Sequence, residues 1–280
     1  MPAGSATTAQ TAEPPLGEAA PPRPWRARFP GWSVLLLPAL TLVLSLAAWW
    51  AATTFTDVQR ILLPPPADVL AELRDRPDYL AEHGRVTLVE TLGGFAIATA
   101  GGLVIGTAIA LSRVFSQMTY PWLVAFNAIP KIALAPLLIV WLGFNLEPKV
   151  AMAVLVCFFP VVLATASGLT STPAELVELA RSLDASRWQT FAKVRFPYAL
   201  PQIFIGLKLA VPLAVIGAVI GEFAGGREGL GYVVNQSGGL GRTDLAFAAL
   251  VVLSVISIVL YYVLVGVERL LLPWVRATTS

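Results

Sequence analysis

Six stretches of this 280-residue chain are long enough and apolar enough to cross a membrane as helices. A helix needs about 20 largely apolar residues to span the hydrocarbon core of a bilayer. Because 56% of the residues are hydrophobic and only 13% are charged, the sequence predicts an all-α, polytopic membrane protein with six transmembrane helices. The six stretches cover residues 31–56, 91–112, 120–142, 150–169, 200–224 and 245–267.

The side chains on which most enzymes depend are scarce. The chain contains one histidine, His83, and one cysteine, Cys157, which lies inside an apolar stretch. It carries neither an H-E-x-x-H motif nor a G-x-x-x-x-G-K-[ST] loop for nucleotide phosphates. We therefore expect no catalytic residue, no metal site and no cofactor, so that any ATP used is hydrolysed by another chain. A net charge of +2 also argues against a nucleic-acid partner.

Six spans place both termini on the same side of the bilayer. Lys and Arg are retained in the cytoplasm more often than they are translocated. With the termini inside, ten basic residues lie on that side and seven, including Lys149, lie outside, while Lys131 and Lys208 fall within spans. We therefore predict a multi-pass membrane protein with both termini in the cytoplasm.

Composition also suggests how the chain is divided. Residues 1–30 are rich in Ala, Pro and Thr without an apolar period, which predicts a disordered cytoplasmic tail. A cleaved signal peptide is disfavoured because Trp49 and Trp50 crowd the position where small residues would be needed. We expect a first transmembrane helix and outer segment over 31–84, five further helices over 85–270, and a cytoplasmic C-terminal tail over 271–280.

The segment STPAELVELARSLDASRWQTFAKVRFPYALP, residues 171–201, interrupts the apolar pattern between the fourth and fifth stretches. Thr172, Pro173 and Glu175 have the spacing of a capping box with proline at the first helical position, which predicts a helix from Pro173. Apolar side chains then recur at helical spacing and predict one apolar face, formed by Leu176, Leu179, Ala180 and Leu183.

A second helix is predicted directly after the first. Ser186 and Gln189 form another capping box, and Pro197 is expected to end the helix. The segment therefore predicts a helix, a tight turn and a helix on the cytoplasmic surface. An ordinary solvated loop remains the alternative.

This loop resembles the "EAA" loop of bacterial ABC importer permeases, in which a coupling helix docks into a groove of the ATP-binding subunit. Leu179 stands where that family has a second alanine, and Asp184 stands where it usually has glycine. Aspartate tolerates turn geometries better than most residues, so the second difference is mild. The matching pattern consists of Glu178, Ala180, Asp184, Ala185, Val194, Phe196 and Pro197.

Other segments extend the resemblance to permeases of the nitrate/sulfonate/taurine type. They are LLPPPADVLAEL, AIPKIALAPLLIVWLGF, FFPVVLATASGL and GEFAGGREGLGYVV, and together they cover about residues 62 to 268. The resemblance implies a type I ABC importer permease fold, with the permease domain over 85–270 and a coupling loop over 171–200.

The same resemblance implies partners and a mechanism. Two ATPase subunits would drive alternating access through the 173–197 loop, and a binding protein outside the membrane would deliver the substrate. The permease would pair with a second permease chain, as a homodimer, and the substrate would be a small organic or inorganic anion or a small nutrient. The implied ATPase-coupling residues are Glu178, Ala180, Arg181, Asp184, Ala185, Arg187, Val194 and Pro197.

Charged residues within or beside the spans are candidates for the solute pathway, because an ionisable group at membrane depth is costly and usually faces a cavity or a partner. These candidates are Glu90, Lys131, Lys208 and Glu222. The spacing of the four residues leaves open which of them form pairs. Lys208 and Glu222 can also lie near the interfaces in structural roles.

Two other classes of membrane protein are alternatives to an importer permease. An ion-coupled secondary transporter would also be hydrophobic, but we would expect internal repeats and broken helices around an ion site. A membrane-bound enzyme would need a nucleophile or a metal constellation, and one histidine and one cysteine offer little for either. Copurification with an ATPase would distinguish an importer permease from both.

Overall fold

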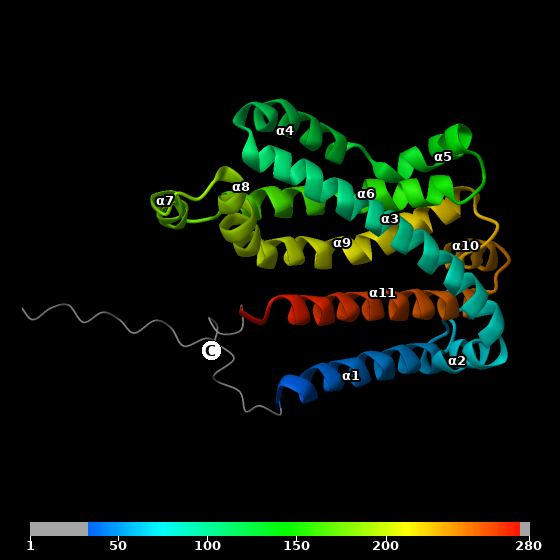
Figure 1. Ribbon diagram of the computed structural model, residues 1–280. Coiled ribbons are helices and arrows are strands. Elements are labelled where there is room, and N and C mark those ends of the chain that lie inside the picture. The colour runs from blue at the N-terminus through cyan, green and yellow to red at the C-terminus, as the bar shows by residue number, and fades with distance from the viewer. Residues whose placement is uncertain (1–32, 275–280) are drawn as a thin grey trace, which may run out of the picture. The chain divides into compact units, whose positions relative to one another are not determined.

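The computed structural model describes residues 33–274, which form helices joined by short turns, with no strand among them (Figure 1). The predicted all-α class is therefore confirmed. The predicted tail of residues 1–30 and the end of the predicted tail 271–280 lie outside the described residues. In chain order the helices are α1 (Ser33–Phe55), α2 (Pro66–Asp75), α3 (Pro77–Leu111), α4 (Arg113–Ala128), α5 (Lys131–Leu142), α6 (Glu147–Thr170), α7 (Ala174–Ser182), α8 (Arg187–Thr190), the π-helical turn η2 (Phe191–Arg195), α9 (Phe196–Gly225), α10 (Leu230–Gly239) and α11 (Thr243–Leu271).

Five helices in the described part of the chain are long and apolar enough to cross a membrane: α1, α3, α6, α11 and the continuous helix Arg187–Gly225, which contains α9. The pair α4 and α5 is a sixth candidate, bent by 93° between its two halves. Counting this pair as one span gives the six predicted spans. α3 begins 14 residues before the predicted stretch 91–112, because its first turns continue the helix through polar residues.

The chain divides into two units, one running through Trp49 and the other beginning at Trp50. The division falls inside α1, whose side chains from Leu36 onward are mostly exposed. Leu42 and Val43, for example, retain 63% and 61% of their exposed area. An apolar helix with exposed leucine and valine side chains is suited to contact with lipid.

The second unit is centred on α6, which packs along α9 and α3 (Figure 1). Small residues allow the backbones to approach closely, as expected where helices associate within lipid. A Cβ added at Gly102 of α3 would lie 2.7 Å from Val161 Cγ1 of α6, and one added at Gly217 of α9 would lie 2.6 Å from the Cα of Ala153. The glycine-rich second stretch therefore does pack closely, through the glycines that face α6.

The predicted third span is not one straight helix. The α4 helix ends at Ala128, Ile129 is extended with φ −65° and ψ 129°, and α5 begins at Lys131. Pro130 explains the break, because proline lacks an N–H and disfavours the helical conformation at the residue before it. Lys131 therefore begins a helix instead of interrupting one.

The first capping box predicted in the 171–201 segment is wrong. The α7 helix begins at Ala174, Pro173 occupies the N-cap, and no side chain caps this end. The Thr172 hydroxyl instead donates to the Leu169 carbonyl at the end of α6, at 3.4 Å. A local bond to the end of α6 thus uses the hydroxyl that a capping box would have needed.

The second capping box is confirmed, but the predicted helix end at Pro197 is wrong. The Ser186 hydroxyl accepts from the Gln189 N–H, and the Gln189 side chain accepts from the Ser186 N–H. The helix then continues through η2 into α9 without a break at Pro197. Pro197 lies in the first turn of α9, where the hydrogen-bond register changes from π to α, so its missing N–H interrupts little.

Candidate functional site

The loop between α6 and α9 is locked by its own backbone. At the end of α7 the Ala185 N–H donates to the Ala180 carbonyl, and the Asp184 N–H donates to the Arg181 carbonyl, both at 3.0 Å. These two bonds form a Schellman motif, which requires a left-handed residue after the helix. Asp184 has φ 56° and supplies it. The aspartate therefore performs the conformational task for which glycine is the usual residue.

The α7 helix has one face turned into the protein and one left open. Val177 and Ala180 are each 8% exposed, whereas Leu179 and Leu183 are 58% and 74% exposed. The predicted apolar face is thus correct for its leucines, while Ala180 belongs to the loop's own packing. Leucines left exposed on a short, capped helix are typical of a surface that a partner covers.

The predicted coupling residues fall into three places. Two hollows flank α7, one with a volume of about 410 Å³ and the other of about 380 Å³. Arg181, Ala185 and Arg187 line the first, and Ala180, Ala185 and Val194 line the second. Glu178 is exposed outside both, Pro197 lies in the first turn of α9, and Asp184 forms the turn between the helices.

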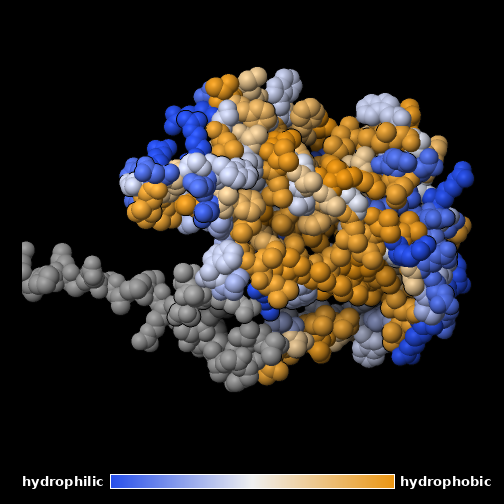
Figure 2. Space-filling view, viewed as in Figure 1, coloured by the Kyte–Doolittle hydropathy of each residue, from blue (hydrophilic) through white to orange (hydrophobic). Residues whose placement is uncertain are grey.

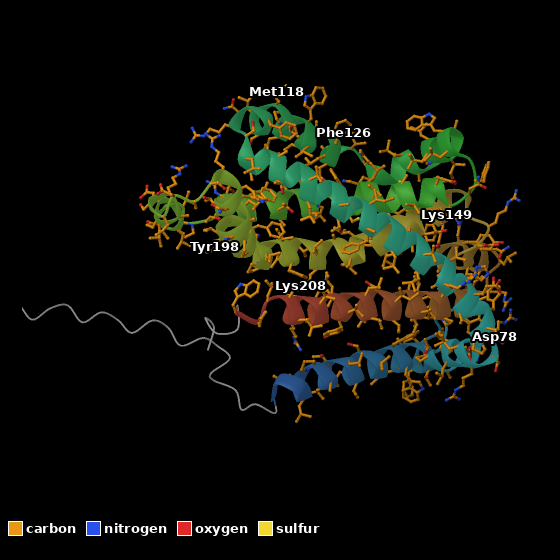
Figure 3. All side chains as sticks on the ribbon, viewed as in Figure 1. Asp78, Met118, Phe126, Lys149, Tyr198 and Lys208 are labelled. Atoms are coloured by element: carbon orange, nitrogen blue, oxygen red, sulfur yellow. The ribbon has the colours of Figure 1, made fainter. Side chains whose placement is uncertain are left out.

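A buried ion pair lies at the opposite end of the bundle, where α3 meets α6. Lys149 Nζ is 2.8 Å from Glu90 Oε1, and the two residues are 7% and 0% exposed. Lys149 also approaches the Glu228 carbonyl at 3.5 Å, which ties the pair to the loop after α9. Figure 3 shows Lys149 toward the α10 end of the bundle.

Glu222 of α9 holds the same loop from the other side. Its carboxylate accepts from the Thr87 hydroxyl at 2.6 Å and from the Gly231 N–H. Thr87 in turn accepts from the Leu230 N–H at 2.8 Å. Gly229 has φ 106°, and a side chain there would collide with the Glu222 carboxylate, so only glycine fits.

His83 completes this set of contacts by accepting from the Gly229 N–H at 2.9 Å. The resulting network connects α3, α6, α9 and the start of α10 through buried polar atoms. We call it the α10-end network, and its side chains are those of His83, Thr87, Glu90, Lys149 and Glu222. Buried polar groups of this kind hold one conformation only when they are hydrogen-bonded.

The four predicted pathway residues therefore lie in different parts of the structure. Glu90 and Glu222 both belong to the α10-end network, whereas Lys208 of α9 pairs with Glu268 of α11 at 2.8 Å. Lys131 is not in an ion pair within the described chain, and its ammonium donates to the Asn127 side chain at 2.9 Å. It lines an apolar pocket of about 300 Å³ together with the aromatic rings of Phe126, Phe158 and Phe159.

Sequence reasoning missed four participants. The sequence places Lys149 just outside the fourth predicted span, but in the structure this residue lies within the first turn of α6 and is buried. His83, Thr87 and Glu268 had no role assigned, because nothing in their spacing shows which helices meet. No group of metal-ligating side chains occurs among residues 33–274 that could hold a metal ion.

Apolar spans, a structured loop between two of them and a buried polar network at the other end define a polytopic membrane protein. The chain's fold matches a chain of the MetNI methionine ABC transporter in inward-facing conformations, with a TM-score of 0.60 at 22% identity. That match covers 72% of this chain and 97% of the other. The type I ABC importer permease fold is therefore confirmed.

Comparison with known proteins identifies the family. Residues 101–277 match the model of the binding-protein-dependent transport system inner membrane component. The riboflavin transport system permease protein RibX of Chloroflexus aurantiacus is 40% identical over 87% of this chain and 91% of its own length. The taurine transport system permease protein TauC of Escherichia coli is 29% identical over 84% and 88%.

The chain belongs to the binding-protein-dependent transport system inner membrane components. It is the membrane-embedded permease subunit of an ABC importer and is not an enzyme, since ATP is hydrolysed by a separate chain. An ATPase and a substrate-binding protein are accordingly its partners. The resemblance to sulfonate- and taurine-type permeases is confirmed, and the comparisons do not support an ion-coupled secondary transporter.

We predict that Lys149→Met destabilises the protein strongly. Removing one partner of a buried ion pair typically costs about 3–5 kcal/mol, because the other charge is left without compensation. The melting temperature of the detergent-purified protein should fall, and adding Glu90→Gln to Lys149→Met should restore part of the loss. Arg85→Met is the matched control, because Arg85 is exposed on the same end of α3 and forms no ion pair within the described chain. An unchanged melting temperature for Lys149→Met would contradict a stabilising role for the pair.

Proposed function

We propose that the loop of residues 173–197 is the element through which the ATPase drives this permease. The observation that carries the proposal is the exposed leucine face of α7, a helix that ends in a Schellman turn and is followed at once by the capping box that starts α8. A rigid short helix with open apolar area can both bind a partner and transmit its movement. The implied coupling residues would then act as docking and orienting groups.

The continuous helix Arg187–Gly225 supports this role. It begins in the loop beside α7 and ends next to Glu222, in the α10-end network. A displacement of the loop would therefore reach the opposite end of the bundle through one helix and its hydrogen bonds. This connection provides a physical route from ATP hydrolysis to alternating access of the pathway.

We further propose that the permease is a homodimer served by two ATPase subunits. The pocket beside Lys131 lies on the surface of a single chain, with Phe126 64% exposed at its edge (Figure 3). A second copy would close such a surface and enclose a pathway between two bundles. The mass of the purified complex distinguishes one permease chain from two, and an active complex with a single chain would rule the homodimer out.

The proposed substrate is a small organic or inorganic anion or a small nutrient. Of the four charged residues predicted to face the pathway, Lys131 offers an ammonium that is not neutralised by an acid in the described chain. Aromatic rings beside a cationic group suit a planar or anionic solute. The names of the riboflavin and taurine relatives are compatible with both kinds of compound. Competition for uptake among such compounds would identify the one transported.

We predict that Leu183→Glu uncouples the ATPase while the spans stay inserted. Burying a leucine contributes about 1.5–3 kcal/mol, so copurification of the ATPase should fall about tenfold or more. Glu178→Lys should have a smaller effect, as expected for a charge at the rim of an interface. Substrate-stimulated ATP hydrolysis should fall in parallel in membranes that contain equal amounts of each variant.

Leu240→Glu is the matched control for this experiment, because Leu240 is 71% exposed and follows α10 at the far end of the bundle. It should leave ATPase copurification unchanged. Ala180→Trp does not test docking cleanly, since Ala180 is buried and the change would disturb the loop itself. If Leu183→Glu and Glu178→Lys both copurified with as much ATPase as wild type does, the coupling proposal would be wrong.

Orientation provides a separate prediction. We propose that both termini and the 173–197 loop face the cytoplasm. In a background of Cys157→Ser, a cysteine replacing the exposed Ser186 should react with an impermeant thiol reagent only from inside. A cysteine replacing the exposed Asp78 should react only from outside (Figure 3). The reverse pattern of labelling would overturn this topology.

A further inference from the structure

Three arginines converge on the larger of the two hollows beside α7. Arg181, Arg187 and Arg195 line it, and its volume is about 410 Å³. The other lining residues are apolar or uncharged, and no acidic side chain is among them: Leu111, Val177, Ala185, Thr190 and Phe191. None of the three guanidinium groups forms an ion pair with any residue in the described range 33–274. We call this hollow the arginine cavity.

The arginine cavity is distinct from the leucine face proposed to dock the ATPase. Leu179 and Leu183 border the second hollow, whereas Val177 and Arg181 of the same helix border the arginine cavity. Figure 2 shows hydrophobic and hydrophilic residues on different sides of the α7 region. Arg181 and Arg187 of the arginine cavity are also among the implied coupling residues, whereas Arg195 belongs neither to that set nor to the second hollow.

The chemistry of the lining indicates the ligand. Guanidinium groups bind phosphate through paired, charge-assisted hydrogen bonds, and three of them together favour an anion. The lining also includes apolar side chains, among them Leu111, the last residue of the membrane-spanning helix α3. A phosphate with an attached acyl chain would match both the guanidinium groups and these apolar side chains, and the end of a spanning helix is where a lipid headgroup is expected.

We propose that the arginine cavity binds the phosphate of an anionic phospholipid in the leaflet next to the coupling loop. The assignment rests on the proposed function only in placing that loop at the cytoplasmic face. Basic clusters beside spans attract anionic headgroups, with each Lys or Arg near the surface contributing about a fivefold change in binding. A bound lipid would fill the space between α3, α7 and η2 and stiffen the loop that the ATPase pushes.

The test is titration of phosphatidylglycerol, and separately of phosphatidylcholine, into the permease–ATPase complex purified in neutral detergent, with bound lipid counted by native mass spectrometry. We expect phosphatidylglycerol to bind more tightly than phosphatidylcholine. Arg195→Gln should weaken phosphatidylglycerol about fivefold, and Arg195→Lys should lie between it and wild type. Arg195 is chosen because it is not among the implied coupling residues.

Arg113→Gln is the matched control, since Arg113 is exposed two residues after Leu111 but does not line the cavity. It should bind phosphatidylglycerol as wild type does. Equal binding by wild type and Arg195→Gln would overturn the proposal. So would displacement of phosphatidylglycerol by inorganic phosphate at equal concentration, which would show a site for the free anion.

The remaining outcomes separate this proposal from the coupling proposal. Loss of the ATPase from Arg195→Gln with unchanged lipid binding would show that the cavity receives a side chain of the ATPase, and the lipid assignment would fail. Leu183→Glu should lose the ATPase while the permease still binds phosphatidylglycerol like wild type. If Leu183→Glu instead keeps the ATPase, the coupling proposal fails while the lipid measurement remains interpretable.

Discussion

Close backbone contact along α6 is the constraint on which the other parts of this permease depend. Lipid tails solvate apolar side chains as well as other helices do, so helices in a bilayer associate mainly through tight van der Waals packing. Gly102 and Gly106 of α3 and Gly217 of α9 provide that closeness by leaving no Cβ between the backbones. With α3 and α9 held against α6, the 173–197 loop lies at one end of the bundle and the α10-end network at the other.

The helix continues through Pro197 without a break, which joins the 173–197 loop directly to the α9 span. A helix break there would have separated the loop from the span, so that movement of one need not move the other. The π turn before the proline allows the helix to run from Arg187 to Gly225, where Glu222 holds the next loop. The two ends of the importer subunit are therefore connected by covalent and hydrogen-bonded structure instead of by a flexible joint.

Charged side chains of the protein are of two kinds, because some form ion pairs and others form none within the described residues. Glu90 with Lys149, and Lys208 with Glu268, form pairs that lessen the cost of placing ions within the bundle. Lys131 and the three arginines of the arginine cavity form no ion pair within the described residues. Recognition of external groups is expected at these unpaired cations, since paired ions have little remaining attraction to offer a ligand.

The all-α membrane class, the apolar spans, the Ser186 capping box and the family could all be predicted from the sequence, because each depends on local composition or on ordered motifs. Predictions from the local sequence were wrong where a neighbouring element offered a competing hydrogen bond or helix register. The end of α6 took the Thr172 hydroxyl, and a π turn carried the helix past Pro197. Only the tertiary structure decided that Lys149 pairs with Glu90, 59 residues away, because an ion pair between helices depends on which faces meet, and close packing of small residues determines those faces.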